Sequence, residues 1–400
     1  MTERWLSGVG YPALMQPATD VVSYYGLPVD VQYCVRCVVS NQRPRITFDE
    51  EGVCSACRYA DRKQREIDWA TREAELVELL DRHRSSDGSH DVVVPCSGGK
   101  DSAAVAYWLK HSYGMHPLTV TWSPHLYTDI GWKNLQAFIA HGYDNILGSP
   151  NGRVHRRLTR LAFEHLGDPF QPFIYGQKAF PMQIACKYGI PLIMYGENGE
   201  VEYGGDLKNA DSPTHDLDGD LMKHYFSGIG PLHWTKYEID EHDLQWYLPP
   251  ALDEMHQVGV ECHFWSYYHR WGPQENYYAA AEHTGFQANP DGRSEGTYSK
   301  YASLDDRLDG FHYYMAFVKF GIGRATSDAS HEVRDGHITR DEAVALVHRF
   351  DGEFPQKYFD DFLAYTDLSE DRFHEIVDSF RSPHLWERDG DEWLLKSRVR

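Results

Sequence analysis

Short apolar runs alternate with helix-like segments through the middle of the chain. The runs that predict β-strands span residues 91–96, 117–122, 143–148 and 191–196. The segments between them carry apolar residues at helical spacing, and the predicted helices span residues 101–114, 132–142, 152–167 and 176–189. Strands that alternate with helices predict an α/β fold with a parallel sheet covered on both faces. A ligand site is then expected beyond the carboxyl ends of the strands.

The regions that flank this alternation follow other patterns. A charged stretch from Ala60 to His83 suits an amphipathic connecting helix. After residue 205 the alternation is lost, and Thr339 and Glu342 form a capping box ahead of a later helical pattern. The predicted units are an irregular arm, a cysteine segment with its connecting helix, an α/β domain and a mainly helical substrate or partner region, at residues 1–30, 31–84, 88–205 and 206–400.

Composition narrows the class of protein. The chain has 400 residues, 42% of them hydrophobic, which is enough for about two or three domains with buried cores. Lys and Arg number 39 against 60 Asp and Glu, and this acidic balance argues against nucleic acid as a partner. No apolar run reaches the ~18 residues of a membrane span, and Glu3 and Arg4 stand where a signal peptide would be apolar. We therefore expect a soluble, cytoplasmic protein with no membrane contact.

Four of the seven cysteines form two CxxC pairs ahead of the α/β domain. The pairs are Cys34 with Cys37 and Cys54 with Cys57, and sixteen residues lie between them. This spacing is typical of a tetrahedral zinc site with four thiolate ligands. Because four protein ligands leave no open position for water, the expected role of Zn²⁺ is structural, in place of a core that so short a segment cannot build. An iron–sulfur cluster and a redox dithiol are the alternatives.

A glycine-containing hexapeptide joins the first predicted strand to the first predicted helix. It comprises Ser97, Gly98, Gly99, Lys100, Asp101 and Ser102. Free backbone N–H groups at a helix start form an anion site, and glycines let phosphate approach the backbone. A Walker A loop would need glycine where the chain has Val94, so the usual kinase or GTPase loop is excluded. An ordinary strand-to-helix turn is the alternative.

SGGKDS resembles the signature of the PP-loop ATP pyrophosphatases, which cleave ATP between the α and β phosphates and form adenylated intermediates. The resemblance implies ATP as substrate and Mg²⁺ as cofactor, with the hexapeptide around the pyrophosphate. In that setting we expect Lys100 to neutralise phosphate charge and Asp101 to help hold Mg²⁺, while the two serines donate hydrogen bonds. The further nucleotide contacts expected from the resemblance are Thr121, Trp122 and Gly196, although Trp122 also suits a core position.

The order of the motifs resembles the N-acetyl sugar amidotransferases of bacterial surface-polysaccharide biosynthesis. The matching segments are YCVRCVVS, RPRITFDEEGVCSAC, SGGKDS, YGENGEVEYGG and KFGIGRATSDASHEVRDGHITRDEA. That family turns the acetamido group of a sugar into an acetamidino group. ATP places AMP on the acetamide oxygen, and ammonia then displaces AMP. The resemblance implies an N-acetylated sugar or sugar nucleotide as substrate. It also implies a separate glutaminase subunit as ammonia donor, because no glutaminase signature occurs in this chain.

The same resemblance implies roles for residues outside the hexapeptide. Glu197, Asn198 and Glu202 follow the fourth strand and are expected to be catalytic, by binding Mg²⁺, deprotonating ammonium or holding the sugar. A solvated polar loop is the alternative for this segment. Arg324 and Asp328 are expected to bind substrate, since arginine suits a carboxylate or phosphate on the sugar. A surface Arg–Asp pair is the alternative there.

A PP-loop tRNA thiolase is the main alternative function, because some thiolases carry a zinc ribbon ahead of SGGKDS. It would need reactive cysteines, for which Cys186 and Cys262 are the candidates, and a basic surface for tRNA. The candidate basic stripe consists of Arg153, Arg156, Arg157 and Arg160. A regulatory ATP sensor is a third possibility, and it would keep the phosphate loop without needing the carboxylates.

Overall fold

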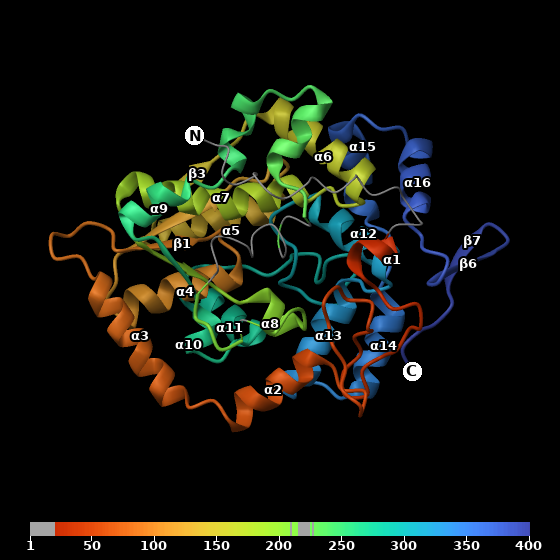
Figure 1. Ribbon diagram of the computed structural model, residues 1–400, viewed down its shortest axis with the longest axis horizontal. Helices are drawn as coiled ribbons and strands as arrows, with labels where there is room; N and C mark the ends of the chain where they lie inside the picture. The colour runs from red at the N-terminus through yellow and green to blue at the C-terminus, as the bar shows by residue number, and fades with distance from the viewer. Residues whose placement is uncertain (1–20, 209, 215–224, 226–227) are drawn as a thin grey trace.

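The computed structural model describes residues 21–208, 210–214, 225 and 228–400. Its centre is a five-stranded parallel sheet in the order β3-β2-β1-β4-β5 (Figure 1). The strands are β1 Val92–Pro95, β2 Pro117–Trp122, β3 Asp144–Gly148, β4 Leu192–Tyr195 and β5 Glu261–Phe264. The predicted α/β fold is confirmed, and β1 to β4 lie in the predicted runs. The fifth strand was not predicted and lies beyond residue 205, where the alternation is lost.

The direction of the chain across the sheet changes at β1. β2 and β3 follow on one side of β1, whereas β4 and β5 lie on the other side. Ligands of open α/β sheets bind in the crevice at such a switch point, beyond the carboxyl ends of the strands. The segments that leave β1 and β4, SGGKDS and ENGEVE, therefore start side by side at the same edge.

Helices cover both faces of the sheet. On one face Val93 and Ile193 pack with α6 and α7, and on the other face Val92, Val94 and Leu192 pack with α3 and α4. Burial on both faces explains why these strands are continuous apolar runs. The helices that follow the strands are α4 Lys100–His111, α5 Asp129–Ala140, α6 Gly152–Leu166, α7 Gln171–Tyr188 and α8 Gly199–Tyr203.

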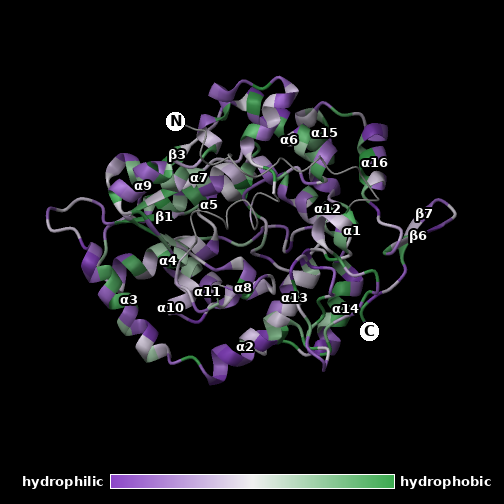
Figure 2. Ribbon diagram, viewed as in Figure 1, coloured by the Kyte–Doolittle hydropathy of each residue, from purple (hydrophilic) through white to green (hydrophobic). Residues whose placement is uncertain are grey.

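The connecting helix predicted within Ala60–His83 is two helices instead of one. They are α2 Ser55–Arg65 and α3 Trp69–His83. The break occurs because the Asp68 side chain accepts hydrogen bonds from the N–H groups of Ala70 and Thr71 and so begins a new helix. The helical spacing continues across the break, so periodicity alone did not reveal it. Figure 2 shows that α2 is mostly hydrophilic.

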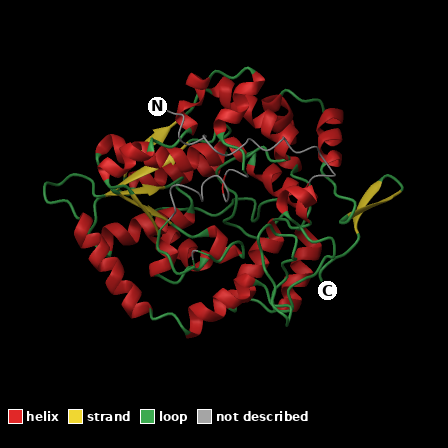
Figure 3. Cartoon of the chain, in the orientation of Figure 1, coloured by secondary structure: helices red, strands yellow, loops and turns green. Residues whose placement is uncertain are grey.

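The later elements are mainly helical, as predicted. The helices are α9 Leu252–Val258, α10 Trp265–Tyr268, α11 Pro273–His283, α12 Asp309–Phe320, α13 Arg324–Asp335, α14 Arg340–Phe350, α15 Phe359–Thr366 and α16 Glu370–Ser379. The 3₁₀ helices are η2 Pro231–Tyr237, η3 Glu241–Tyr247 and η4 Gln356–Tyr358. An antiparallel pair, β6 Trp386–Asp389 and β7 Glu392–Leu395, stands apart from the central sheet (Figure 3). The Thr339–Glu342 capping box of α14 is confirmed.

Two further predictions concern the ends of the chain and membranes. Most of the predicted irregular arm lies outside the described residues, and within its described part Val21–Tyr25 form the short helix α1. In the described part of the chain, every helix is too short or too polar to cross a membrane.

Candidate active site

The loop after β1 packs closely against α5, and a glycine makes this approach possible. Gly98 has a φ of 81°, and a Cβ added there would lie 2.7 Å from the Cα of Leu135. Only glycine fits both the backbone conformation and this close approach. Gly99 is the N-cap of α4, and among the described residues no side chain caps that helix end. The first N–H groups of α4 are thus available to an anion.

Lys100 and Asp101 lie at the start of α4 and contact each other. The Lys100 ammonium donates to the Asp101 carboxylate and lies 5.1 Å from the centre of the Tyr301 ring. The Asn276 amide of α11 donates to the other Asp101 oxygen at 2.8 Å. The lysine is buried, with 7% of its surface exposed, so its charge is balanced mainly by this carboxylate. An incoming phosphate would compete for the same ammonium.

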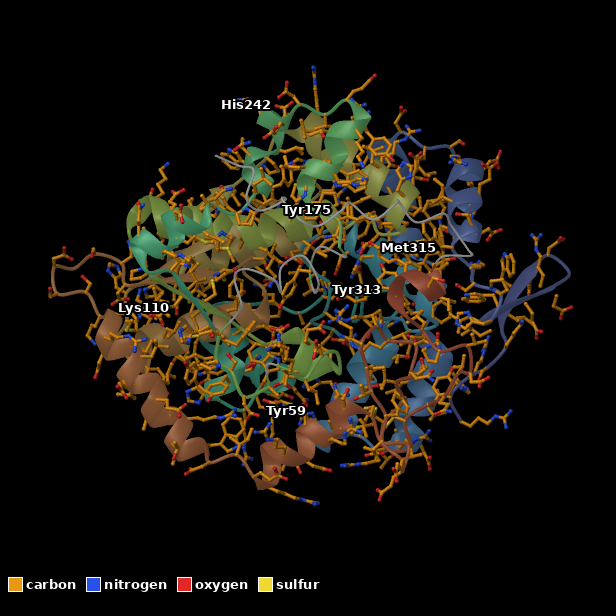
Figure 4. All side chains as sticks on the ribbon, in the orientation of Figure 1. Tyr59, Lys110, Tyr175, His242, Tyr313 and Met315 are labelled. Atoms are coloured by element: carbon orange, nitrogen blue, oxygen red, sulfur yellow. The ribbon has the colours of Figure 1, made fainter. Side chains whose placement is uncertain are left out.

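A cavity of about 350 Å³ opens beyond the carboxyl ends of β1 and β4. The predicted site residues that line it are Lys100, Asp101, Glu197, Arg324 and Asp328. They come from three segments that are up to 228 residues apart in sequence (328 − 100), and the fold brings them together. Tyr313 of α12 also lines the cavity, and Figure 4 shows it near the middle of the molecule.

Glu197 has an altered proton affinity. Burial and the nearby Asp101 charge raise the pKa of Glu197 to about 7, against the opposing effect of Lys100 and Lys178. Burial lowers the pKa of Lys178 to about 8, and the Glu197 charge opposes that change. The Lys178 ammonium lies 4.6 Å from the centre of the Tyr195 ring. A carboxyl and an amine that both titrate near neutrality can exchange protons with a substrate at physiological pH.

Arg324 and Asp328 form an ion pair in the cavity wall. Arg324 Nε lies 3.0 Å from Asp328 Oδ1, and the guanidinium carbon lies 4.6 Å from the centre of the Tyr313 ring. The Thr297 hydroxyl donates to the second Asp328 oxygen at 2.6 Å. Both side chains are mostly buried. The pair is therefore not an exposed surface pair, which was the alternative to a role in binding. Asp328 orients Arg324 at the cavity.

The start of α13 is fixed by a carboxylate from outside the helix. Asp351 accepts hydrogen bonds from the N–H groups of Gly323 and Thr326, at 2.9 and 3.0 Å. Burial raises the pKa of Asp351 to about 6, although these hydrogen bonds oppose the shift. Asp351 therefore caps α13 and sets the position from which Arg324 reaches the cavity.

Several predicted site residues do not line this cavity. Trp122 is buried among Phe180 and Tyr247, and a Cβ at Gly176 would lie 1.9 Å from its ring. The Thr121 hydroxyl donates to the carbonyl of the residue before the loop and accepts from Asn145. These contacts are those of core side chains.

Of the other predicted nucleotide and catalytic residues outside the cavity lining, Ser97, Gly98, Gly99 and Ser102 lie beside it in the loop after β1 and the first turn of α4. The rest lie around α8. The Asn198 side chain caps α8 by accepting from the N–H of Glu200 at 3.2 Å. Gly196 packs against Trp271, whose ring would lie 2.8 Å from a Cβ at that position. The carboxylate of Glu202 points instead toward α2, where Lys63 donates to it at 2.5 Å.

The four cysteines of the CxxC pairs form one buried cluster. The sulfur atoms of Cys34 and Cys57 lie 3.9 Å apart, and those of Cys37 and Cys54 lie 3.7 Å apart. A tetrahedral ion with bonds of about 2.3 Å places its sulfur ligands roughly 3.8 Å apart, so the cluster fits Zn²⁺. Backbone N–H groups also point at the sulfurs, for example that of Cys54 at the Cys34 sulfur, 3.3 Å away.

Three basic side chains near the cysteine cluster form hydrogen bonds with α8. Arg45 donates to the Glu200 carboxylate at 2.6 and 2.8 Å, and Lys63 donates to Glu202. Arg334 of α13 donates to the backbone carbonyl of Glu202 at 3.1 Å. Burial alone would lower the pKa of Arg334, but the negative charge of the cluster sulfurs raises it. We call these contacts, made by Arg45, Lys63 and Arg334, the α8 clamp.

The site includes residues that the sequence did not indicate. Tyr301 and Tyr313 line the cavity, and Lys178 lies close enough to Glu197 for their charges to interact. Lys178 lies in the middle of α7, while Tyr301 and Tyr313 lie in aromatic-rich segments. Single lysines and tyrosines at helical spacing usually face solvent or core, and no motif marks them. Only the position of Lys178 next to Glu197 in space distinguishes it.

The two cysteines that a thiolase would need lie in surroundings that disfavour the thiolate. Burial raises the pKa of Cys186 to about 11 and that of Cys262 to about 12. A nucleophilic cysteine acts as the thiolate, which such environments disfavour. In the arginine stripe on α6, Arg157 and Arg160 donate to backbone carbonyls of neighbouring segments. Both observations weaken the thiolase alternative.

The comparison with known families concerns the C-terminal part of the chain. Residues 295–400 match the model of the C-terminal domain of WbpG-like LPS biosynthesis proteins. The match supports the surface-polysaccharide family that the sequence resembles, and it contains Arg324, Asp328, Tyr301 and Tyr313 of the cavity. No curated protein gives a match to the chain.

Proposed function

We propose that this protein is an ATP-dependent amidotransferase of surface-polysaccharide biosynthesis that converts an N-acetylated sugar into an acetamidino sugar. The observation that carries the proposal is the cavity itself. It joins the PP-loop-like hexapeptide, the carboxylate loop after β4 and a region that matches WbpG-like LPS biosynthesis proteins. Each of these three segments occurs in the amidotransferase resemblance of the sequence.

The hexapeptide would hold the triphosphate. The uncapped start of α4 and the Lys100 ammonium favour an anion there, and Asp101 has oxygen ligands of the kind Mg²⁺ prefers. Bound Mg²⁺ would neutralise phosphate charge. The acetamide oxygen attacks the α phosphate, the α–β bond breaks and pyrophosphate leaves with the bonding electrons.

Glu197 would act on the nitrogen nucleophile. Ammonia attacks the acetamide carbon, AMP leaves with the electrons of its C–O bond, and one proton must be removed from nitrogen. A carboxyl whose pKa is about 7 can accept that proton, and Lys178 beside it can pass the proton on. Arg324, held by Asp328, would bind an acidic group of the sugar. Ammonia would come from a separate glutaminase subunit.

One assay tests the proposal. The protein is incubated with ATP, Mg²⁺, an ammonium salt and candidate diacetamido sugars, free or nucleotide-linked. AMP and pyrophosphate should appear only with the correct sugar, and mass spectrometry should find nitrogen in place of the acetamide oxygen. Glutamine should not replace ammonium unless a glutaminase is added. Release of ADP in place of AMP would exclude this chemistry.

A double variant separates the amidotransferase from the thiolase. Cys186→Ser with Cys262→Ser leaves an amidotransferase active, since neither thiol lines the cavity. Loss of sugar-dependent pyrophosphate release in this variant, with unchanged thermal stability, would instead implicate the thiols in the reaction.

A further inference from the structure

Two histidines and an aspartate meet at the amino edge of the sheet, opposite the cavity. His90 lies two residues before β1, His116 lies directly before β2, and Asp144 is the first residue of β3. The three strands are neighbours, with Val92 opposite Pro117 and Leu118 opposite Asp144. Because parallel strands begin at the same edge, these three side chains come together although 54 residues (144 − 90) separate the outer two.

The three side chains have the spacing of metal ligands. His90 Nε2 lies 3.0 Å from Asp144 Oδ2, and His116 Nε2 lies 3.8 Å from the same oxygen. All three candidate ligand atoms lie within 4.8 Å of one another, and the two imidazole rings are stacked 4.3 Å apart. Tetrahedral zinc with bonds of about 2.0–2.2 Å spaces such ligands by roughly 3.4 Å. The side chains are partly exposed, so small rotations suffice to close the remaining difference.

The hydrogen bond made by His116 Nδ1 determines that Nε2 is the ring nitrogen available to a metal. His116 Nδ1 lies 3.1 Å from the carbonyl oxygen of Gly88, and a carbonyl only accepts, so Nδ1 carries the proton. In the neutral ring Nε2 then presents a lone pair toward the Asp144 carboxylate. Metal-binding histidines commonly donate their other N–H to a carbonyl in this way. Gly88, with a φ of 86°, makes the turn that places this carbonyl.

We propose that His90, His116 and Asp144 bind a divalent transition-metal ion of the Zn²⁺ class. Two imidazoles and one carboxylate suit such an ion, whereas Mg²⁺ and Ca²⁺ prefer oxygen ligands alone. Three protein ligands leave a fourth position for water. The ion joins the starts of β1, β2 and β3 and stabilises the folded state in proportion to its binding. The site is independent of the cysteine cluster and of the proposed reaction.

The test uses the full protein with its cysteine zinc retained. Weakly bound metal is removed by a brief wash with a mild chelator, and Zn²⁺ is then titrated calorimetrically. We expect one equivalent beyond that held by the cysteines, and a Tm that rises with free Zn²⁺. Co²⁺ in this site should give weak visible bands without the intense thiolate charge-transfer absorption of Co²⁺ among cysteines.

Variants locate the ion. His116→Asn and Asp144→Asn should each weaken the additional binding by at least about tenfold. The matched control is His374→Asn, because His374 is an exposed histidine 3.9 Å from a carboxylate, that of Glu370, but does not belong to the three-residue group. Its Zn²⁺ binding should equal that of the unmodified protein. Absence of the additional equivalent, or equal binding by His116→Asn and the unmodified protein, overturns the proposal.

Discussion

The cysteine cluster and the cavity are built in opposite ways. The cluster takes all four ligands from 24 consecutive residues, 34 to 57, and every ligand is visible as a CxxC pair. The cavity takes its polar residues from segments that meet only after the sheet and the C-terminal helices have formed. A site whose residues are close in sequence can therefore be identified from the spacing of those residues. A site that the fold assembles from distant segments can be predicted only for the residues that belong to a recognisable motif. The α8 clamp connects the two regions, so they are not energetically separate.

The largest effect should come from removing a cluster ligand. Cys34→Ser should release one equivalent of zinc and unfold the segment around residues 31–57, because the bound ion would hold the four sulfurs together in place of a core that so short a segment cannot build. Through the α8 clamp the change should also abolish turnover. Metal analysis and circular dichroism check the first effect, and the pyrophosphate assay checks the second. A folded, metal-free variant with normal activity would contradict a structural role for zinc.

Lys100→Ala should abolish pyrophosphate release while the zinc held by the cysteines is retained. The lysine contacts Asp101 and faces the cavity, so its loss removes phosphate neutralisation without opening the cluster. Lys110→Ala is the matched control, since Lys110 is a half-buried lysine of the same helix that donates to the Gly142 carbonyl and lies over the Tyr143 ring, outside the cavity lining. If both variants turned over ATP equally, the phosphate loop would have no role in the reaction.

Glu197→Gln should have opposite effects on activity and stability. If Glu197 is the base, kcat should fall by about 10²- to 10⁴-fold. Because the pKa of Glu197 is raised to about 7 in the folded protein, stability present at low pH is lost as the pH rises through 7. The neutral glutamine avoids that loss, so the variant should have the higher Tm at pH 8 and a similar Tm near pH 4. A lower Tm at pH 8 would show that the carboxylate is needed for folding.

Breaking the α8 clamp should give a smaller, graded effect. Lys63→Met leaves the Glu202 carboxylate buried without its partner and should lower the free energy of unfolding by about 3 kcal/mol. The double variant with Glu202→Met should recover most of that loss, and denaturant titration of the three proteins measures the coupling. Zinc content should not change. If the single variant were as stable as the unmodified protein, the cluster and α8 would be independent.

Most of the sheet was predictable because β1, β2 and β4 are buried on both faces, whereas β3 is more exposed. An unbroken apolar run such as Val92 to Val94 indicates a buried strand, and the helices between the strands carry apolar residues at clear helical spacing. β5 was not predicted because polar Glu261 and His263 alternate with its apolar residues and because it follows a long segment with no regular pattern. The break between α2 and α3 was not predicted, because the Asp68 cap acts through backbone hydrogen bonds and does not change the spacing of the apolar residues.

The candidate site was predictable only where a motif marked it. Lys100 and Glu197 follow strand ends, and parallel strands place such residues at one edge. The direction of the Glu202 side chain depends on Lys63 in α2, which no pattern of the carboxylate loop reveals. Likewise Lys178 has no local signal, since its pKa depends on burial by segments far away in sequence.

β5 lies far from β4 in the sequence, and this separation limits where the chain can be shortened. β5 pairs with β4 through all four residues of that strand, yet 65 residues separate the end of β4 from the start of β5 (261 − 195 − 1). A truncated protein that stops at residue 205 would retain the SGGKDS hexapeptide but leave the hydrogen-bonding groups of β4 uncovered. Uncovered strand edges recruit other chains, so such a fragment should form aggregates when expressed, and usable truncations must extend beyond Phe264.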